Sequence, residues 1–199
     1  MKLVIQSILY SNFRMLVHST NQISQTAEKM FHQKRSKVGY SKEESYDGYN
    51  NCGAMCMSIY TLLKNAGINC DVYKSSIGYG KHLEDHVYLL YDGWLIDPTY
   101  KQFLRDERGI DDDYQKKMYD ELDTFYIGEK NDLLKIFRDM SELNEKTYNF
   151  GIIDIEELEY FWKNPICITE KYESFNRNVS TFNINNNIIN IHKKEELNL

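Results

Sequence analysis

The sequence predicts an α+β fold in which a helix packs on an antiparallel sheet. Three adjoining stretches carry this prediction: an amphipathic helix over 52–66, a strand over 68–73 and a hairpin over 86–97. Apolar residues of the first stretch recur at helical spacing, and Gly67 follows where a left-handed helix cap is expected. The second stretch alternates apolar and polar residues, as half-buried strands do. In the third, Asp92 and Gly93 form a two-residue turn between two apolar strands.

The chain before and between these elements shows weaker patterns. Residues 3–35 place apolar side chains among polar ones, which is compatible with one or two amphipathic helices. The polar stretch from Lys34 to Asn51 indicates an irregular approach to the 52–66 helix. A glycine-containing loop is expected over 75–80.

Beyond Tyr100 the character of the sequence changes. Residues 106–123 are rich in Asp and Glu, a helix is expected from 132 to 143, and residues 182–191 interleave Asn and Ile. We therefore expect a core domain with N-terminal helices over residues 1–105. Residues 106–199 are expected to form an acidic, mainly helical extension with an Asn-rich tail, packed on that core.

Composition limits the class of protein. The 199 residues suffice for one well-filled core, and a net charge of −6 argues against a nucleic-acid partner, since such binding depends on clustered Lys and Arg. No apolar run is long enough for a membrane span, and the first residues make a poor signal peptide. We expect a cytoplasmic protein with no membrane partner, although signal-independent secretion would leave no mark in the sequence. The four cysteines lack framework spacing and are expected to be reduced.

Cys52 stands at the predicted start of the 52–66 helix. Free backbone N–H groups and the positive end of the helix dipole stabilise a thiolate at such a position. Asn50 and Asn51 just before it are good N-cap residues, and Gly53 leaves the backbone beside the sulfur uncrowded. Because an intracellular cysteine is more often a small buried hydrophobe, this position alone does not make Cys52 a nucleophile.

The hairpin supplies a base and a residue to orient it. With the turn at 92–93, His86 and Asp97 become diagonal neighbours on one face of the sheet, within reach of a hydrogen bond. A carboxylate so placed can hold the imidazole in the tautomer that accepts a thiol proton. His82 is the rival for the base role, which we assign to His86 because it shares the face of Asp97. The alternative for Asp97 is that it only ends a strand before Pro98.

The order of these elements resembles the transglutaminase-like superfamily, which shares the papain-type fold. In that family a cysteine opens a helix that ends in a Gly-Ile pair, as Cys52 and Gly67-Ile68 do here. The family's histidine opens the next strand, and its aspartate follows a Gly-Trp turn in a motif ending Asp-Pro-Thr, matched here by the run from His86 to Thr99. The resemblance covers about residues 50–100. It implies a papain-like core and the triad Cys52, His86 and Asp97.

The resemblance also implies an oxyanion hole that includes the backbone N–H of Cys52. For the second donor the sequence leaves Asn50, Asn51 and the tyrosines between residues 46 and 49 open. Trp94 is a further candidate for contact with the substrate or the oxyanion.

Such a site implies acyl transfer on amide bonds of a protein or peptide through a thioester, without a cofactor. Transfer to water would make a protease or glutamine deamidase, which we expect first, whereas transfer to lysine would make a cross-linking transglutaminase. Two alternatives of other classes stay open. One is a non-catalytic binding module on the same fold. The other is a structural zinc site of Cys52, Cys56, His82 and His86, whose spacing lies in the range of zinc ligands.

Overall fold

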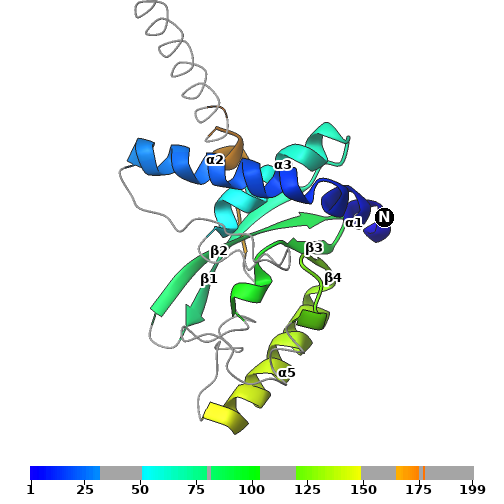
Figure 1. Cartoon of the computed structure of the whole chain (residues 1–199), viewed down its shortest axis with the longest axis vertical. Helices are drawn as coiled ribbons and strands as arrows, with labels where there is room; N and C mark the ends of the chain where they lie inside the picture. Colours follow the sequence, from blue (N-terminus) through cyan, green and yellow to red (C-terminus); the bar gives the residue numbers. More distant parts are fainter. Residues whose placement is uncertain (32–50, 80–81, 104–119, 149–164, 175–176, 178–199) are drawn as a thin grey trace, which may run out of the picture.

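The computed structural model describes residues 1–31, 51–79, 82–103, 120–148, 165–174 and 177, and all structural statements refer to these. They form an α+β fold on one antiparallel sheet, as expected (Figure 1). The helices are α1 (Lys2–Ser11), α2 (Phe13–Phe31), α3 (Cys52–Asn65), the 3-10 helix η1 (Tyr100–Phe103) and α5 (Lys130–Tyr148). The strands are β1 (Asp71–Tyr79), β2 (His82–Tyr91), β3 (Trp94–Asp97), β4 (Tyr126–Gly128) and β5 (Ile166–Cys167).

The sheet has five strands in the order β4-β3-β2-β1-β5. Every neighbouring pair is antiparallel. β1 pairs with β2 along its whole length, whereas β2 and β3 pair only over residues 89–91 and 94–96. The N-terminal half of β2 therefore extends past the end of β3, and this geometry decides where the candidate site lies.

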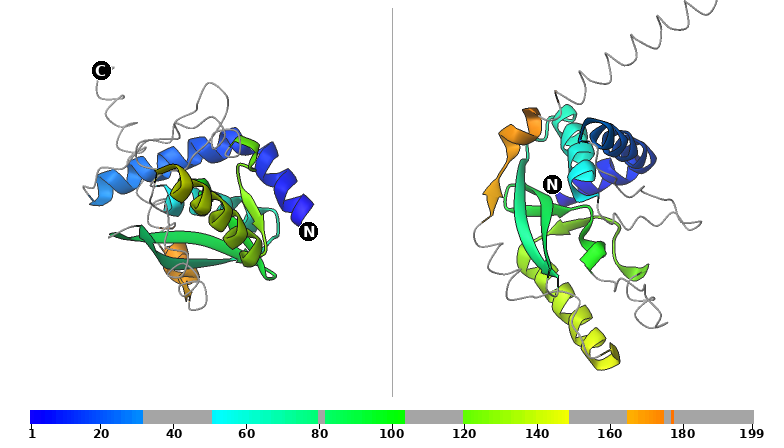
Figure 2. Two further views of the ribbon diagram at one scale, coloured as in Figure 1. Left: turned by 90° about the horizontal axis from the view of Figure 1, so that it is seen from below. Right: turned by 90° about the vertical axis from the view of Figure 1, so that its left-hand side faces the viewer.

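Helices cover both faces of the sheet (Figures 1 and 2). On one face, α1, α2 and α3 share an apolar core with the sheet residues Val72, Leu89, Ile96 and Ile127. On the other face, α5 packs against the sheet through Leu133, Leu134, Phe137, Tyr88, Leu95 and Tyr126. Burial on both faces explains why the stretch 87–90 is continuously apolar instead of alternating.

The helix predicted over 52–66 is α3, and its end is the predicted one. Gly67 has a φ of +78°, Ile68 N donates to Leu63 O at 2.8 Å, and Gly67 N donates to Lys64 O at 3.0 Å. These two bonds make a Schellman cap. Because Ile68 belongs to this cap, the strand predicted over 68–73 begins only at Asp71.

Predictions for the other described segments have mixed outcomes. The N-terminal pattern forms the two helices α1 and α2, and the helix predicted over 132–143 lies within α5. The loop predicted over 75–80 is wrong as far as Tyr79, because β1 continues to that residue and β2 begins at His82. This end of the β1–β2 ribbon lies beyond the residues that pair with β3. The two strands can pair there without the alternation of apolar and polar residues by which a strand is recognised in a sequence.

Both edge strands of the sheet come from beyond residue 105. β4 pairs with β3 at one edge, and β5 pairs with β1 at the other. The sheet thus includes strands from both the expected core (residues 1–105) and the expected extension (residues 106–199). The predicted acidic stretch lies outside the described residues up to 119, as do the Asn/Ile stretch and the approach segment up to Asn50. Within the described part of the chain, no helix has the length and apolar content needed to cross a bilayer.

Candidate active site

Cys52 is the first residue of α3, directly after the N-cap residue Asn51. Its side chain is partly exposed, whereas that of Cys56, one turn further along, is buried. The sulfur of Cys52 therefore stands at the end of the helix where unpaired N–H groups and the helix dipole favour a negative charge.

The start of α3 is held by a contact with α2. Ser24 Oγ donates to Asn51 Oδ1 at 2.7 Å, and both side chains are buried. Asn51 occupies the expected N-cap position but makes no side-chain capping bond, because its amide oxygen is bonded to Ser24. Further along the same interface, Thr20 Oγ1 donates to Ser58 Oγ at 3.2 Å. These polar contacts fix the start of α3 against α2.

The hairpin has the predicted register. Leu90 pairs with Leu95 and Tyr91 with Trp94, and the turn residues Asp92 and Gly93 have φ values of +48° and +79°. Positive φ at both positions is what a type I′ turn requires, and this turn fixes which residues face one another.

As the register predicts, His86 and Asp97 form a buried pair. His86 Nε2 lies 2.6 Å from Asp97 Oδ2, and each side chain is only 1% exposed. The other carboxylate oxygen, Oδ1, accepts a hydrogen bond from Thr99 N at 3.0 Å. Because both oxygens are engaged, the carboxylate is held in one orientation toward the imidazole.

The pKa of His86 reflects opposing influences. Burial is the largest and lowers it, but the charge of Asp97, the hydrogen bond to Asp97 and the interaction with Cys52 together raise the pKa of His86 to about 10. Because Cys52 is among the groups that raise the pKa of His86, the thiol and the ring influence one another. At neutral pH the imidazole is therefore protonated, between a carboxylate and the sulfur.

The N-terminal part of α3 lies directly against β2. Cys56 Sγ donates to the Val87 carbonyl oxygen at 3.1 Å, one residue from His86 in the chain. Burial, assisted by the nearby Asp97 charge, raises the pKa of Cys56 well above its ordinary value. This second thiol therefore stays protonated, and Cys52 is the sulfur available for chemistry at this end of the helix.

Gln102 is a site residue that the sequence did not reveal. Its Nε2 lies 3.2 Å from His86 Nδ1 and donates to Thr99 Oγ1 at 3.1 Å. An amide can donate to a neutral Nδ1 or, turned over, accept from a protonated one, so Gln102 is an alternative partner for the ring nitrogen that we expect to serve the thiol. Gln102 is brought to the site by a single 3-10 turn after Thr99, in which Gln102 N donates to Thr99 O at 3.0 Å. So short a turn leaves no periodic pattern in the sequence.

His82 lies too far along the strand to exchange places with His86. It begins β2, pairs with Tyr79 and stands four residues before His86, which is about 13 Å at the rise of a strand. Alternate residues of a strand share a face, so His82 and His86 lie on the same face of β2. The distance from Asp97 along the strand therefore decides between the two histidines. Among the described side chains, which exclude that of His82, no three His, Cys, Asp or Glu residues are grouped to hold a metal ion.

The remaining candidates lie apart from the pair or outside the described residues. Trp94 begins β3, about 10 Å along the strand from Asp97, and Lys2 Nζ lies 6.0 Å from the centroid of its ring. Trp94 lines a hollow of about 460 Å³ together with Asp92, Gly93, Glu129, Lys130 and Asn131. Asn50 and the tyrosines between 46 and 49 lie outside the described residues, so the second oxyanion donor stays a prediction.

The geometry therefore brings Cys52, His86 and Asp97 together, with Gln102 beside the imidazole. No protein-family model, curated protein or solved structure matches the chain. The resemblance to the transglutaminase-like superfamily remains an expectation that rests on the motifs of residues 50–100.

Proposed function

We propose that this chain is a cysteine-dependent acyl-transfer enzyme acting on amide bonds of a protein or peptide, with Cys52, His86 and Asp97 as its triad. The observation that carries the proposal is the buried 2.6 Å contact between His86 and Asp97. It is supported by Cys52, at the start of α3, which is among the groups that raise the pKa of His86. Nucleophile, base and orienting group are the three parts that such catalysis requires.

The proposed reaction begins with the sulfur of Cys52 attacking the amide carbonyl carbon. The C–N bond breaks as the protonated His86 gives its proton to the leaving nitrogen, which yields a thioester and a free amine. The imidazole, now neutral, takes a proton from water, and the resulting hydroxide attacks the thioester carbon. The products are a carboxylic acid and the regenerated Cys52–His86 pair, so water is the only co-reactant. Asp97 keeps the ring aligned and stabilises its charge throughout.

Hydrolysis is the outcome we place first, as a protease or a glutamine deamidase. A lysine amine in place of water would give an isopeptide cross-link by the same thioester. The choice between acceptors depends on how far water is excluded from the thioester. We base the preference for hydrolysis on the family resemblance alone.

Mass spectrometry of a peptide and protein pool incubated with the purified chain tests the proposal. New termini indicate proteolysis, conversion of Gln to Glu indicates deamidation, and Gln–amine adducts indicate cross-linking. Each product must vanish with Cys52→Ala. If no product depends on Cys52 across a broad pool, the chain is a binding module and the proposal is wrong. Near-stoichiometric zinc, lost together with folding on chelation, would instead support the metal site.

A further inference from the structure

The segment 165–174 crosses the edge of the sheet and reaches α3 (Figure 2). It is anchored first on β1, where Tyr73 pairs with Cys167. Ile168 N then donates to Val72 O at 2.8 Å, and Val72 N donates to Thr169 Oγ1 at 2.9 Å. A short piece of the chain far from Cys52 in sequence is thereby fixed beside the nucleophile helix.

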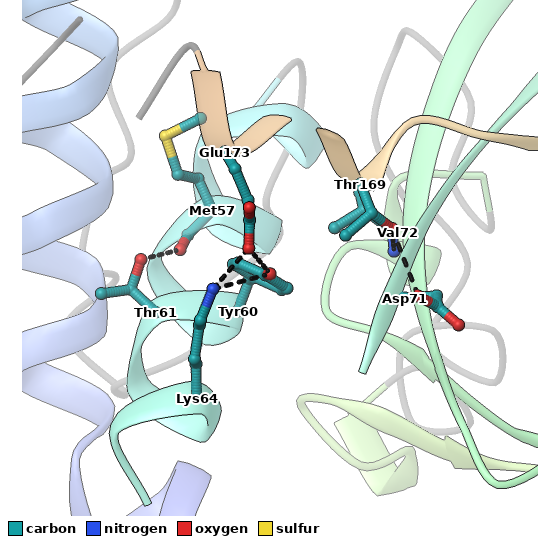
Figure 3. Close-up of polar contacts among 8 residues, drawn as sticks. All are labelled: Met57, Tyr60, Thr61, Lys64, Asp71, Val72, Thr169 and Glu173. Atoms are coloured by element: carbon teal, nitrogen blue, oxygen red, sulfur yellow. Dashed lines mark hydrogen bonds and ion pairs between the residues drawn. The ribbon is translucent and has the colours of Figure 1, made fainter. Parts of the chain in front are cut away.

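The same segment is anchored on the middle of α3 (Figure 3). Glu173 accepts a hydrogen bond from Tyr60 OH at 2.6 Å and forms an ion pair with Lys64. The Lys64 and Glu173 side chains are partly exposed, so this ion pair contributes little stability. These contacts hold the segment in place but do not reach the start of the helix.

Tyr172 is the residue of this segment that reaches the first turn of α3. Its side chain is buried and packs edge-on against Tyr60, with ring centroids 6.3 Å apart. The hydroxyl donates to the Gly53 carbonyl oxygen. Gly53 directly follows Cys52, so the hydroxyl contacts the backbone of the turn that begins at Cys52.

We propose that Tyr172 is a positioning residue for the nucleophile, an inference that rests on the function proposed above. Through its hydrogen bond to the Gly53 carbonyl, its hydroxyl holds the first turn of α3 in place. The backbone N–H groups of that turn are the ones that face a thiolate on Cys52. The active unit therefore includes a residue of the C-terminal extension, although no motif around Tyr172 signals it.

The test compares Tyr172→Phe with Tyr60→Phe in the full chain. Both changes remove one hydroxyl from the same pair of packed rings, but only the first removes a contact with Gly53. The probe is iodoacetamide, and the alkylation rate of Cys52 is followed by peptide mapping between pH 5 and 9. Thermal unfolding checks that each variant is folded.

We expect Tyr172→Phe to slow alkylation of Cys52 at pH 6 by about two- to fivefold, the size of one weakened helix-dipole interaction. The pH dependence of alkylation should also move to higher pH, which a loss of stability in a still folded protein would not cause. Tyr60→Phe should change both quantities less than Tyr172→Phe does, because the Gly53 contact is kept and Glu173 still has its ion pair with Lys64. A rate and pH dependence for Tyr172→Phe that match the wild type would overturn the proposal.

Two outcomes are kept distinct. If Cys52 of the wild type does not react at pH 6, the proposed function fails, whereas a reactive Cys52 that is insensitive to Tyr172→Phe overturns only the positioning role. If Tyr172→Phe does not fold, Thr169→Val provides the test instead. It removes the hydrogen bond from Val72 N to Thr169 Oγ1, which anchors the segment on β1, and it changes no residue that contacts α3. It should slow Cys52 alkylation in the same direction, and an unchanged rate would contradict the proposal.

Discussion

Replacing Asp97 by Asn tests the orienting carboxylate with a single atom change. Thr99 N–H donates to Oδ1, so the amide oxygen of the new side chain is expected to stay there. Its NH₂ group then takes the place of Oδ2, 2.6 Å from His86 Nε2, and donates to that nitrogen. The proton of the neutral ring moves to Nδ1, the nitrogen that must accept from the thiol. The variant should therefore fold but hold the imidazole in the wrong tautomer.

The size of the effect follows from two losses. The charge of Asp97 is the largest influence that raises the pKa of His86, and without it burial acts to lower that pKa. The wrong tautomer alone costs up to about 10⁴-fold in serine enzymes. A thiol at a helix start depends less on its base, so we expect turnover to fall by about 10² to 10⁴, or roughly 3 to 5.5 kcal/mol in the barrier.

The assay needs no known substrate. Iodoacetamide reacts with the Cys52 thiolate, so its rate at pH 6 reports how well the His86 imidazolium stabilises that thiolate. We expect Asp97→Asn to slow alkylation by about tenfold or more, since a tenfold change corresponds to only about 1.4 kcal/mol. Asp92→Asn is the matched control: it makes the same chemical change on the same hairpin, at a turn residue with φ +48° that Asn tolerates. Turnover or alkylation of Asp97→Asn within about threefold of the control would remove Asp97 from the triad.

Three further predictions concern the histidines and the thiols. His86→Ala should abolish turnover and slow Cys52 alkylation while His82→Ala leaves both largely intact, and the reverse result would assign the base to His82. In peptide mapping at pH 6, Cys52 should be alkylated before the exposed Cys167 and the buried Cys56; a faster reaction elsewhere would contradict its role as nucleophile. In a Cys52→Ala background, where no thiol shares the proton, His86 with its raised pKa should stabilise the fold relative to His86→Gln. That stabilisation should be complete below pH 6.5 and be lost, by up to a few kcal/mol, as pH rises through the pKa of His86 in this background, which Asp97 still raises but Cys52 no longer does. Urea unfolding as a function of pH would show the loss, and a pH-independent difference would be inconsistent with a raised pKa.

The contact between His86 and Asp97 could be predicted because its geometry is local. A two-residue turn with positive φ at Asp92 and Gly93 determines the register of both strands, and the register determines that His86 and Asp97 are neighbours. The end of α3 is local for the same reason, since Gly67 provides the left-handed residue that the cap needs. Geometry that is determined within a few residues of the chain can be predicted without knowledge of the fold.

Other parts of the site depend on contacts between segments far apart in the sequence. Tyr172 reaches Gly53 only because β5 docks on the edge of β1, and a two-residue strand has no periodicity to detect. The side chain of Asn51 would serve as a cap in an isolated helix, but Ser24 of α2 takes its oxygen instead. Gln102 lies close to His86 in space through a 3-10 turn that the apolar pattern does not signal.

Asp97 and its two successors explain why the site lies at this point of the sheet. Pro98 has no N–H to donate, so the ladder between β2 and β3 cannot continue past Asp97. Thr99 N–H turns back to the Asp97 carboxylate, and the chain leaves the sheet in η1. Because the chain leaves the sheet here, β2 has no partner in β3 beside Val87. The N-terminal part of α3 approaches β2 at this point, closely enough for Cys56 to donate to the Val87 carbonyl. The residues that end β3 therefore also free the part of β2, beside His86, against which the start of α3 packs.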